Sequence, residues 1–207
     1  MNQAPFKYLY FSHSFSHGLP VTPPAYATAG PPPTMLFSPR PKAPKSLKRA
    51  VSNGTPSWRR ELAAFVDGGG SQHAPINGGG DTLLLLACRY GQSSVASLLA
   101  ADADIEYANK VGHRALHEAV LSGDVATVAA VLAADADVDS QKLAGWTPLH
   151  LACTKRTPEA VAVVAQLLVH KAQPTLKNKD GWNACMVSGA TLPLPTGTTY
   201  LHEFCSL

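Results

Sequence analysis

The chain has 207 residues, and 17 Lys or Arg against 14 Asp or Glu give it a formal net charge of +3 at pH 7. No apolar run approaches the ~18–20 residues that a membrane-spanning helix needs, so the composition excludes such a helix. Charge is uneven: residues 1–60 hold eight Lys or Arg and no Asp or Glu, whereas the remainder is acidic.

The first segment, residues 1–56, is rich in Pro, Ser and Gly and has no sustained hydrophobic period. It is predicted to be a disordered basic tail. Three other readings stay open: an organelle transit peptide, a polyproline ligand around Pro41 to Pro44, and a phosphorylation site at Ser52 after Lys48-Arg49. The transit peptide is less favoured, because the first 39 residues contain a single basic residue, Lys7.

The next segment, residues 57–79, begins with an amphipathic stretch over 57–67 that predicts one helix, with the length of the second helix of a capping repeat. A glycine-rich loop follows. No GxxxxGK[ST] pattern follows these glycines, so phosphate binding is not predicted.

From Gly80 onward one pattern returns three times and begins a fourth, led by Gly80, Gly112, Gly145 and Gly181 at spacings of 32, 33 and 36 residues. The predicted repeats are 80–111, 112–144 and 145–180, with a partial fourth over 181–189. The third reads Gly-Trp-Thr-Pro-Leu-His-Leu-Ala, in which Thr147 is an expected helix N-cap and Pro148 the first helical residue.

Each repeat carries two short segments with apolar residues at i, i+3 and i+4, as in Leu116, Ala119 and Val120, which predicts a helix pair. Helices of about nine residues are marginal alone, so stacking on the next repeat must supply their burial. Asp102, Asp135 and Lys171 follow the second helices.

A period near 33 with Thr-Pro-Leu-His-x-Ala resembles the ankyrin repeat family. The resemblance implies an all-α solenoid of helix-turn-helix repeats with hairpin finger loops, about three full repeats plus a partial fourth. It also implies that Asp102, Asp135 and Lys171 stand where the family prefers Gly. The implied function is protein binding without catalysis, by a monomer that uses no cofactor.

After residue 189 the pattern is lost, and residues 190–207 are predicted to be a divergent tail. A solenoid needs a polar cap on its last face. Either the tail folds over that face, or the chain is a truncated or alternatively spliced form, which is the favoured reading. Three extra residues, 155–157, predict a longer loop in the third repeat.

The residues with chemical potential have structural explanations. His117 and His150 are expected to tie neighbouring turns together, and His113 with His117 lacks a third metal ligand, so no metal site is predicted. Cys88 and Cys153 occupy core positions, so no catalytic residue is predicted.

The finger loops are predicted to form one edge that runs from acidic to basic and attracts a polarised protein. Trp146 and Trp182 head successive repeats at the same position and are typical interaction anchors. The alternative is a solvated edge with tryptophans packed on adjacent fingers. The residues expected to contact a partner are Asp104, Glu106, Asp137, Asp139, Trp146, Lys177 and Trp182.

A narrower resemblance covers residues 57–189 and is most specific in Leu-Lys-Asn-Lys-Asp-Gly-Trp-Asn, residues 176–183. It is to a branch of the family that binds the catalytic domain of alanyl-tRNA synthetase and limits serine mischarging. The resemblance implies a cytoplasmic or nuclear protein without direct nucleic-acid binding, and candidate serine acceptors at Lys179 and Lys142. The alternatives are a lysine-acceptor cofactor in proofreading, and a generic adaptor or shortened isoform without independent function.

Overall fold

The computed structural model describes residues 41–155 and 157–188. The predictions for residues 1–40, including a transit peptide, and for the tail at 190–207 lie outside the described residues. The helices are α1 (Lys45–Asn53), α2 (Trp58–Asp67), α3 (Leu83–Arg89), α4 (Ser93–Ala100), α5 (Ala115–Ser122), α6 (Val125–Leu132), the 3-10 turn η1 (Leu143–Gly145), α7 (Pro148–Thr154), α8 (Pro158–Val169) and α9 (Ala184–Ser188). No strand occurs in this part of the chain, and the all-α prediction is confirmed.

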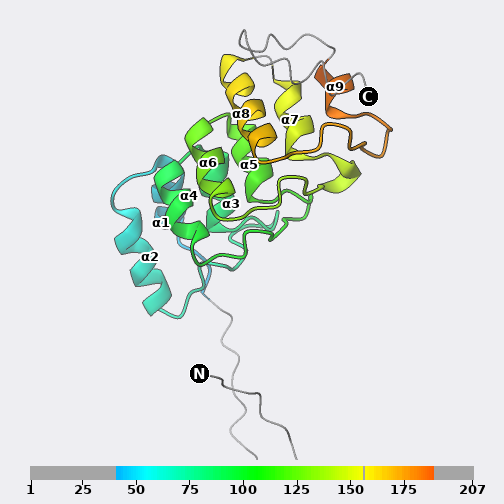
Figure 1. Ribbon diagram of the computed structural model, residues 1–207. Coiled ribbons are helices and arrows are strands. Elements are labelled where there is room, and N and C mark those ends of the chain that lie inside the picture. Colours follow the sequence, from blue (N-terminus) through cyan, green and yellow to red (C-terminus); the bar gives the residue numbers. More distant parts are fainter. Residues whose placement is uncertain (1–40, 156, 189–207) are drawn as a thin grey trace, which may run out of the picture. The chain divides into compact units, whose positions relative to one another are not determined.

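The helices stack in two layers (Figure 1). Helices α3, α5, α7 and α9 pack in succession to form one layer, and α4, α6 and α8 form the other. Each helix therefore contacts its own partner and the equivalent helix of the next repeat. The loops that join one pair to the next project to the same side, and these loops are the fingers: residues 101–114, 133–147 and 170–183.

The core lies between the two layers and is continuous through the repeats. The equivalent residues Leu84, Leu116 and Leu149 are at most 2% exposed. Burying such a side chain contributes about 1.5–3 kcal/mol. Because no single pair encloses this core, the repeats are stable only as a stack.

Helix α1 contradicts the prediction that residues 1–56 form a disordered tail. Leu47 and Val51 are fully buried, and α1 packs against both α2 and α3. The helix starts directly after Pro44 and ends at Gly54, which has a φ of 62°. The prediction failed at this segment because prolines and basic residues hide a short apolar stripe, one turn apart, that is buried only against α2 and α3.

The inner helices begin as the sequence indicates. Thr147 Oγ1 accepts a hydrogen bond from the His150 main-chain N, and Pro148 is the first helical residue. Thr157 likewise caps α8 before Pro158. After the outer helices, Asp135 and Lys171 have φ of 59° and 67°, in the left-handed region that favours Gly. Asp102, at the corresponding place in the first repeat, is outside that region.

The fourth repeat contributes only its inner helix to the described structure. Asn183 Oδ1 accepts a hydrogen bond from the Met186 N at the start of α9, and Ala184 is fully buried. Within residues 41–155 and 157–188, no helix is both long and apolar enough to cross a membrane.

Candidate functional site: the finger edge

Each finger ends in the same tight turn, which begins three residues before the leading glycine of the next repeat. The turn begins at Asn77, Asn109, Lys142 or Asn178, and in each case the main-chain oxygen of that residue accepts a hydrogen bond from the N of the leading glycine, at 2.9–3.2 Å. The glycine-rich loop that precedes Gly80 therefore also ends in such a turn. Sequence reasoning missed this column, although the recurring Asn three residues before Gly is visible once the repeats are aligned.

The asparagine side chains hold these turns. Asn109 Oδ1 accepts hydrogen bonds from the N of Val111 and of His113, at 3.1 and 2.9 Å. Asn178 does the same for Asp180 and Trp182. Lys142 cannot accept such bonds, and in its finger Ala144 takes a left-handed φ of 68°. The third turn therefore has the same shape with weaker local support.

Neighbouring fingers are joined through their backbones. Lys110 N donates to Gly79 O, and Lys179 N donates to Ala144 O, both at 3.0 Å. Lys110, Leu143 and Lys179 hold equivalent positions, immediately after the residue that starts each turn, and we call them the fingertip row. A Cβ atom on Gly80, Gly112 or Gly145 would lie 3.4, 2.7 or 3.1 Å from the main-chain N of the corresponding row residue. Each row residue therefore sits over the leading glycine of the preceding repeat.

The repeat histidines connect inner helices to the next finger. His117 Nε2 donates to Trp146 O at 3.2 Å, and His150 Nε2 donates to Trp182 O at 2.9 Å. In both rings Nδ1 faces a main-chain N–H of its own repeat, at 3.3 Å, which fixes the tautomer with the proton on Nε2. Burial lowers the pKa of His117 to about 4, so this ring is neutral in the folded protein.

The acidic residues proposed as partner contacts divide into two kinds. Glu106 Oε1 accepts from Asp137 N at 2.7 Å, and Asp139 Oδ1 accepts from Gln173 N at 2.9 Å, so each of these carboxylates bridges to the next finger. Glu106 also pairs with Arg114 at 2.8 Å. Asp104 and Asp137 are exposed, and each accepts a hydrogen bond from the main-chain N two residues on. Much of the acidity thus serves the fold rather than a free surface.

The two tryptophans also differ. Trp182 is 55% exposed. Trp146 is half-buried. The centroid of its ring lies 5.8 Å from that of the His150 ring and 5.9 Å from Lys142 Nζ. The two tryptophans are therefore unequally exposed, because Lys142 and His150 lie beside the Trp146 ring, and their role as partner anchors stays a prediction.

The finger lysines named from the sequence are brought to this edge. Lys177 and Lys179 are exposed, whereas Lys142 is half-buried over Trp146. Lys110 is also exposed and holds the same turn position as Lys179. The sequence does not single it out, because acidic residues dominate its finger.

A charged cluster connects the first two repeats beside the fingers. Arg89 pairs with Glu118 through Nε and Nη2, at 3.0 and 2.7 Å, and with Asp81 at 2.7 Å, while His113 Nδ1 lies 3.0 Å from Glu118. Burial opposes ionisation of Glu118, but hydrogen bonds from His113 and Arg89 outweigh it and lower its pKa. The pKa of Asp81 is lowered against burial in the same way, by Arg89, Asn77 and Asn109. Both carboxylates therefore already have hydrogen-bond partners within the protein.

Cys88 and Cys153 are buried in the core. Burial raises the pKa of the Cys88 and Cys153 thiols, that of Cys153 to about 12, so the reactive thiolate is disfavoured. His113 and His117 stack with ring centroids 6.0 Å apart. Among the residues that the structure describes, no three His, Cys, Asp or Glu are grouped to hold a metal ion.

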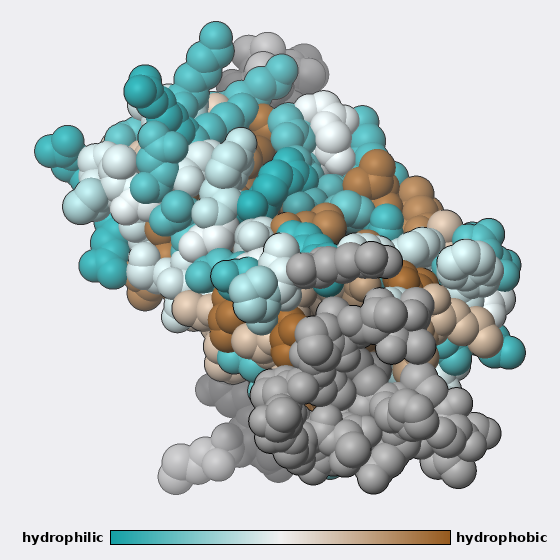
Figure 2. All heavy atoms as spheres, turned by 90° about the horizontal axis from the view of Figure 1, so that it is seen from above, coloured by the Kyte–Doolittle hydropathy of each residue, from teal (hydrophilic) through white to brown (hydrophobic). Residues whose placement is uncertain are grey.

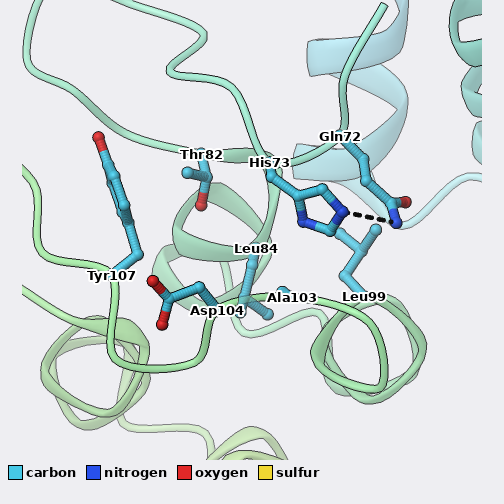
Figure 3. Close-up of a pocket in the computed structure, with 8 residues that line it drawn as sticks. All are labelled: Gln72, His73, Thr82, Leu84, Leu99, Ala103, Asp104 and Tyr107. Carbon is cyan, nitrogen blue, oxygen red and sulfur yellow. Dashed lines mark hydrogen bonds between the residues drawn. The ribbon is translucent and has the colours of Figure 1, made fainter. Parts of the chain in front are cut away.

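A pocket beside the first finger is too small for a ligand (Figure 3). Its lining comes from the loop before α3, from the inner and outer helices, and from the finger: Gln72, His73, Thr82, Leu84, Leu99, Ala103, Asp104 and Tyr107. Its enclosed space of about 20 Å³ is roughly that of one water molecule. Figure 2 shows one face of the exposed surface as largely hydrophilic with separate hydrophobic patches.

A family model for ankyrin repeats, in three copies, matches residues 47–142 and 116–191. The chain belongs to the ankyrin repeat family. The match begins within α1, in agreement with an ordered helix there. Ankyrin repeats are protein-interaction modules.

Proposed function

We propose that this ankyrin protein binds alanyl-tRNA synthetase through its finger edge and limits serine mischarging, as a relative of ankyrin repeat domain-containing protein sixteen. The observation that carries the proposal is the third finger. The most specific stretch of the resemblance, residues 176–183, forms this finger and exposes Lys177, Lys179 and Trp182. A stretch with exposed charges and an exposed tryptophan is suited to recognition. The side chains of Asn178 and Asn183 in this stretch support the fold instead.

The test is capture of alanyl-tRNA synthetase from cell lysate by the full chain, compared with a Trp182→Ala variant. Trp182 contributes its main-chain oxygen to His150, so removal of the side chain leaves this hydrogen bond in place. Capture by the wild-type chain and loss in the variant would support the proposal. Absence of capture by wild-type protein that melts cooperatively would remove the synthetase as partner.

A second function, serine acceptance by lysine, is supported by the exposure of Lys110 and Lys179 at one equivalent position. A neutral Nζ would attack the carbonyl carbon of seryl adenylate, the C–O bond to AMP would break, and an amide would form with release of a proton. Lys142 is the weaker candidate because it lies over Trp146. Mass spectrometry of the chain after incubation with synthetase, serine and ATP tests this, and unmodified lysines would contradict it.

The competing view is a generic ankyrin adaptor. Three repeats and a fragment are near the minimum for a stable stack. A broad, non-cooperative thermal transition would favour a form without independent function.

A further inference from the structure

The fingertip row combines two exposed cations with exposed apolar side chains. Lys110 and Lys179 are exposed at its ends. Leu143, between them, is 60% exposed, and Val111, next to Lys110, is 53% exposed. Exposed aliphatic side chains on two successive turns, with Lys110 at one end and Lys179 at the other, form a surface with an apolar centre and two basic ends.

The row is rigidly held. Lys110 and Lys179 are fixed by backbone hydrogen bonds to the preceding finger, and each row residue lies over a leading glycine. Lys142 is directed over the Trp146 ring and is not a member of the row. Asp180 follows Lys179, and its carboxylate accepts a hydrogen bond from Asn178 Nδ2 at 3.4 Å.

The spacing of the row restricts the shape of the partner. Packed helices lie about 8–10 Å apart, so equivalent residues of successive repeats are separated by about that distance. A polyproline II segment advances about 3.1 Å per residue with three residues per turn, so every third side chain returns to one face about 9 Å further on. An added β-strand is disfavoured, because the Lys110 and Lys179 N–H groups already bond to the neighbouring fingers.

From this arrangement we infer that the fingertip row binds an extended, polyproline II-like segment of a partner protein with the pattern acidic-x-x-apolar-x-x-acidic. The acidic residues pair with Lys110 and Lys179, and the apolar residue packs on Leu143 and Val111. Each surface ion pair contributes about twofold to fivefold in affinity. This inference rests on the proposed binding function and specifies the chemistry of what is bound, independently of whether the partner is the synthetase.

The test is selection of a random twelve-residue peptide library on the full chain, in parallel with Lys110→Glu/Lys179→Glu, Leu143→Ser and the control Val169→Ser. Val169 is 80% exposed and is the last residue of the outer helix α8, outside the fingertip row. Wild-type and control proteins should enrich peptides with two acidic residues six apart around an apolar residue. The charge-reversed protein should enrich Lys or Arg at those two places, and Leu143→Ser should lose the apolar preference. Matching thermal transitions establish that all variants are folded.

Four results would overturn the inference. The enriched peptides could lack this spacing, or show the seven-residue spacing typical of a bound helix. The charge-reversed protein could enrich the same peptides as the wild type, or the folded wild-type protein could enrich none. Capture of alanyl-tRNA synthetase by the same variants separates the two proposals. If the charge-reversed protein still captures the synthetase, the proposed function is supported but the fingertip row is not its binding surface. If the peptides show the predicted pattern but the synthetase is not captured, the fingertip row is supported and the synthetase is excluded as the partner.

Discussion

His150 donates a hydrogen bond from Nε2 to the main-chain oxygen of Trp182, 2.9 Å away and 32 residues later in the chain. His117 makes the equivalent bond to Trp146 one repeat earlier. These two bonds fix the end of a finger to the inner helix of the preceding repeat. The position of the exposed Trp182 side chain therefore depends on a fully buried histidine.

Replacing His150 by Ala should lower the free energy of unfolding by about 1–3 kcal/mol, because the Trp182 carbonyl and the Thr147 N–H lose a buried partner. Chemical denaturation measures this. The exposed His170 at the end of α8 provides the matched control, since His170→Ala removes no buried hydrogen bond. Equal effects of the two substitutions would show that the bond contributes nothing.

Mild acid should destabilise the protein through His117. Its pKa is about 4 when folded, below the ordinary histidine value of 6.5, so the unfolded chain binds the extra proton. Stability is fully present above about pH 6.5 and is lost as pH falls towards 4, by up to about 1.4 kcal/mol per pH unit. Urea denaturation at pH 7, 6 and 5 measures the slope. A pH-independent midpoint across this range would contradict the neutral buried ring.

The Arg89–Glu118 pair should be coupled. Glu118→Gln should cost about 1–3 kcal/mol at neutral pH, since it removes the charge that Arg89 and His113 face. A double-mutant cycle with Arg89→Met isolates the pairwise contribution. Additive single effects would contradict the coupling. Because folding lowers the pKa of Glu118, this contribution is present above the unfolded value near 4 and lost below it.

Much of the fold could be predicted from the sequence because the same local signals recur. The leading glycines and the apolar spacing of the helices appear in successive repeats, and the Thr147-Pro148 helix start of the third repeat agrees with them. Helix α1 could not be predicted in this way, since its few apolar residues are meaningful only once α2 and α3 cover them.

The candidate site was harder to predict than the fold. Sequence position placed Trp146 and Trp182 together, but exposure depends on neighbours from other helices, and His150 and Lys142 enclose Trp146. Glu106 and Asp139 look like free surface acids in the sequence. In the structure each carboxylate accepts a hydrogen bond from a main-chain N–H group of the next finger, which the sequence does not show. Alignment of the turns alone would have found Lys110 and the asparagine column.

Lys171→Gly should stabilise the protein by about 0.5–1 kcal/mol. The left-handed conformation costs a side-chain-bearing residue about 1–2 kcal/mol, while Gly adds about 0.5–1 kcal/mol of chain entropy to be lost on folding. Asp102→Gly is the control, because Asp102 occupies the corresponding place without a positive φ. The thermal midpoint should rise for the first variant and stay level or fall for the second; the reverse order would refute the assigned backbone conformations.

The central claim is that the finger edge is the binding surface, and the most direct measurement is synthetase capture by Trp182→Ala beside Val169→Ala. Both residues are exposed, at 55% and 80%, one on the third finger and the other on the outer helix α8. The account predicts that the wild-type chain and Val169→Ala retain alanyl-tRNA synthetase and that Trp182→Ala loses it. Retention by Trp182→Ala together with loss by Val169→Ala would place binding on the outer helices and contradict the claim.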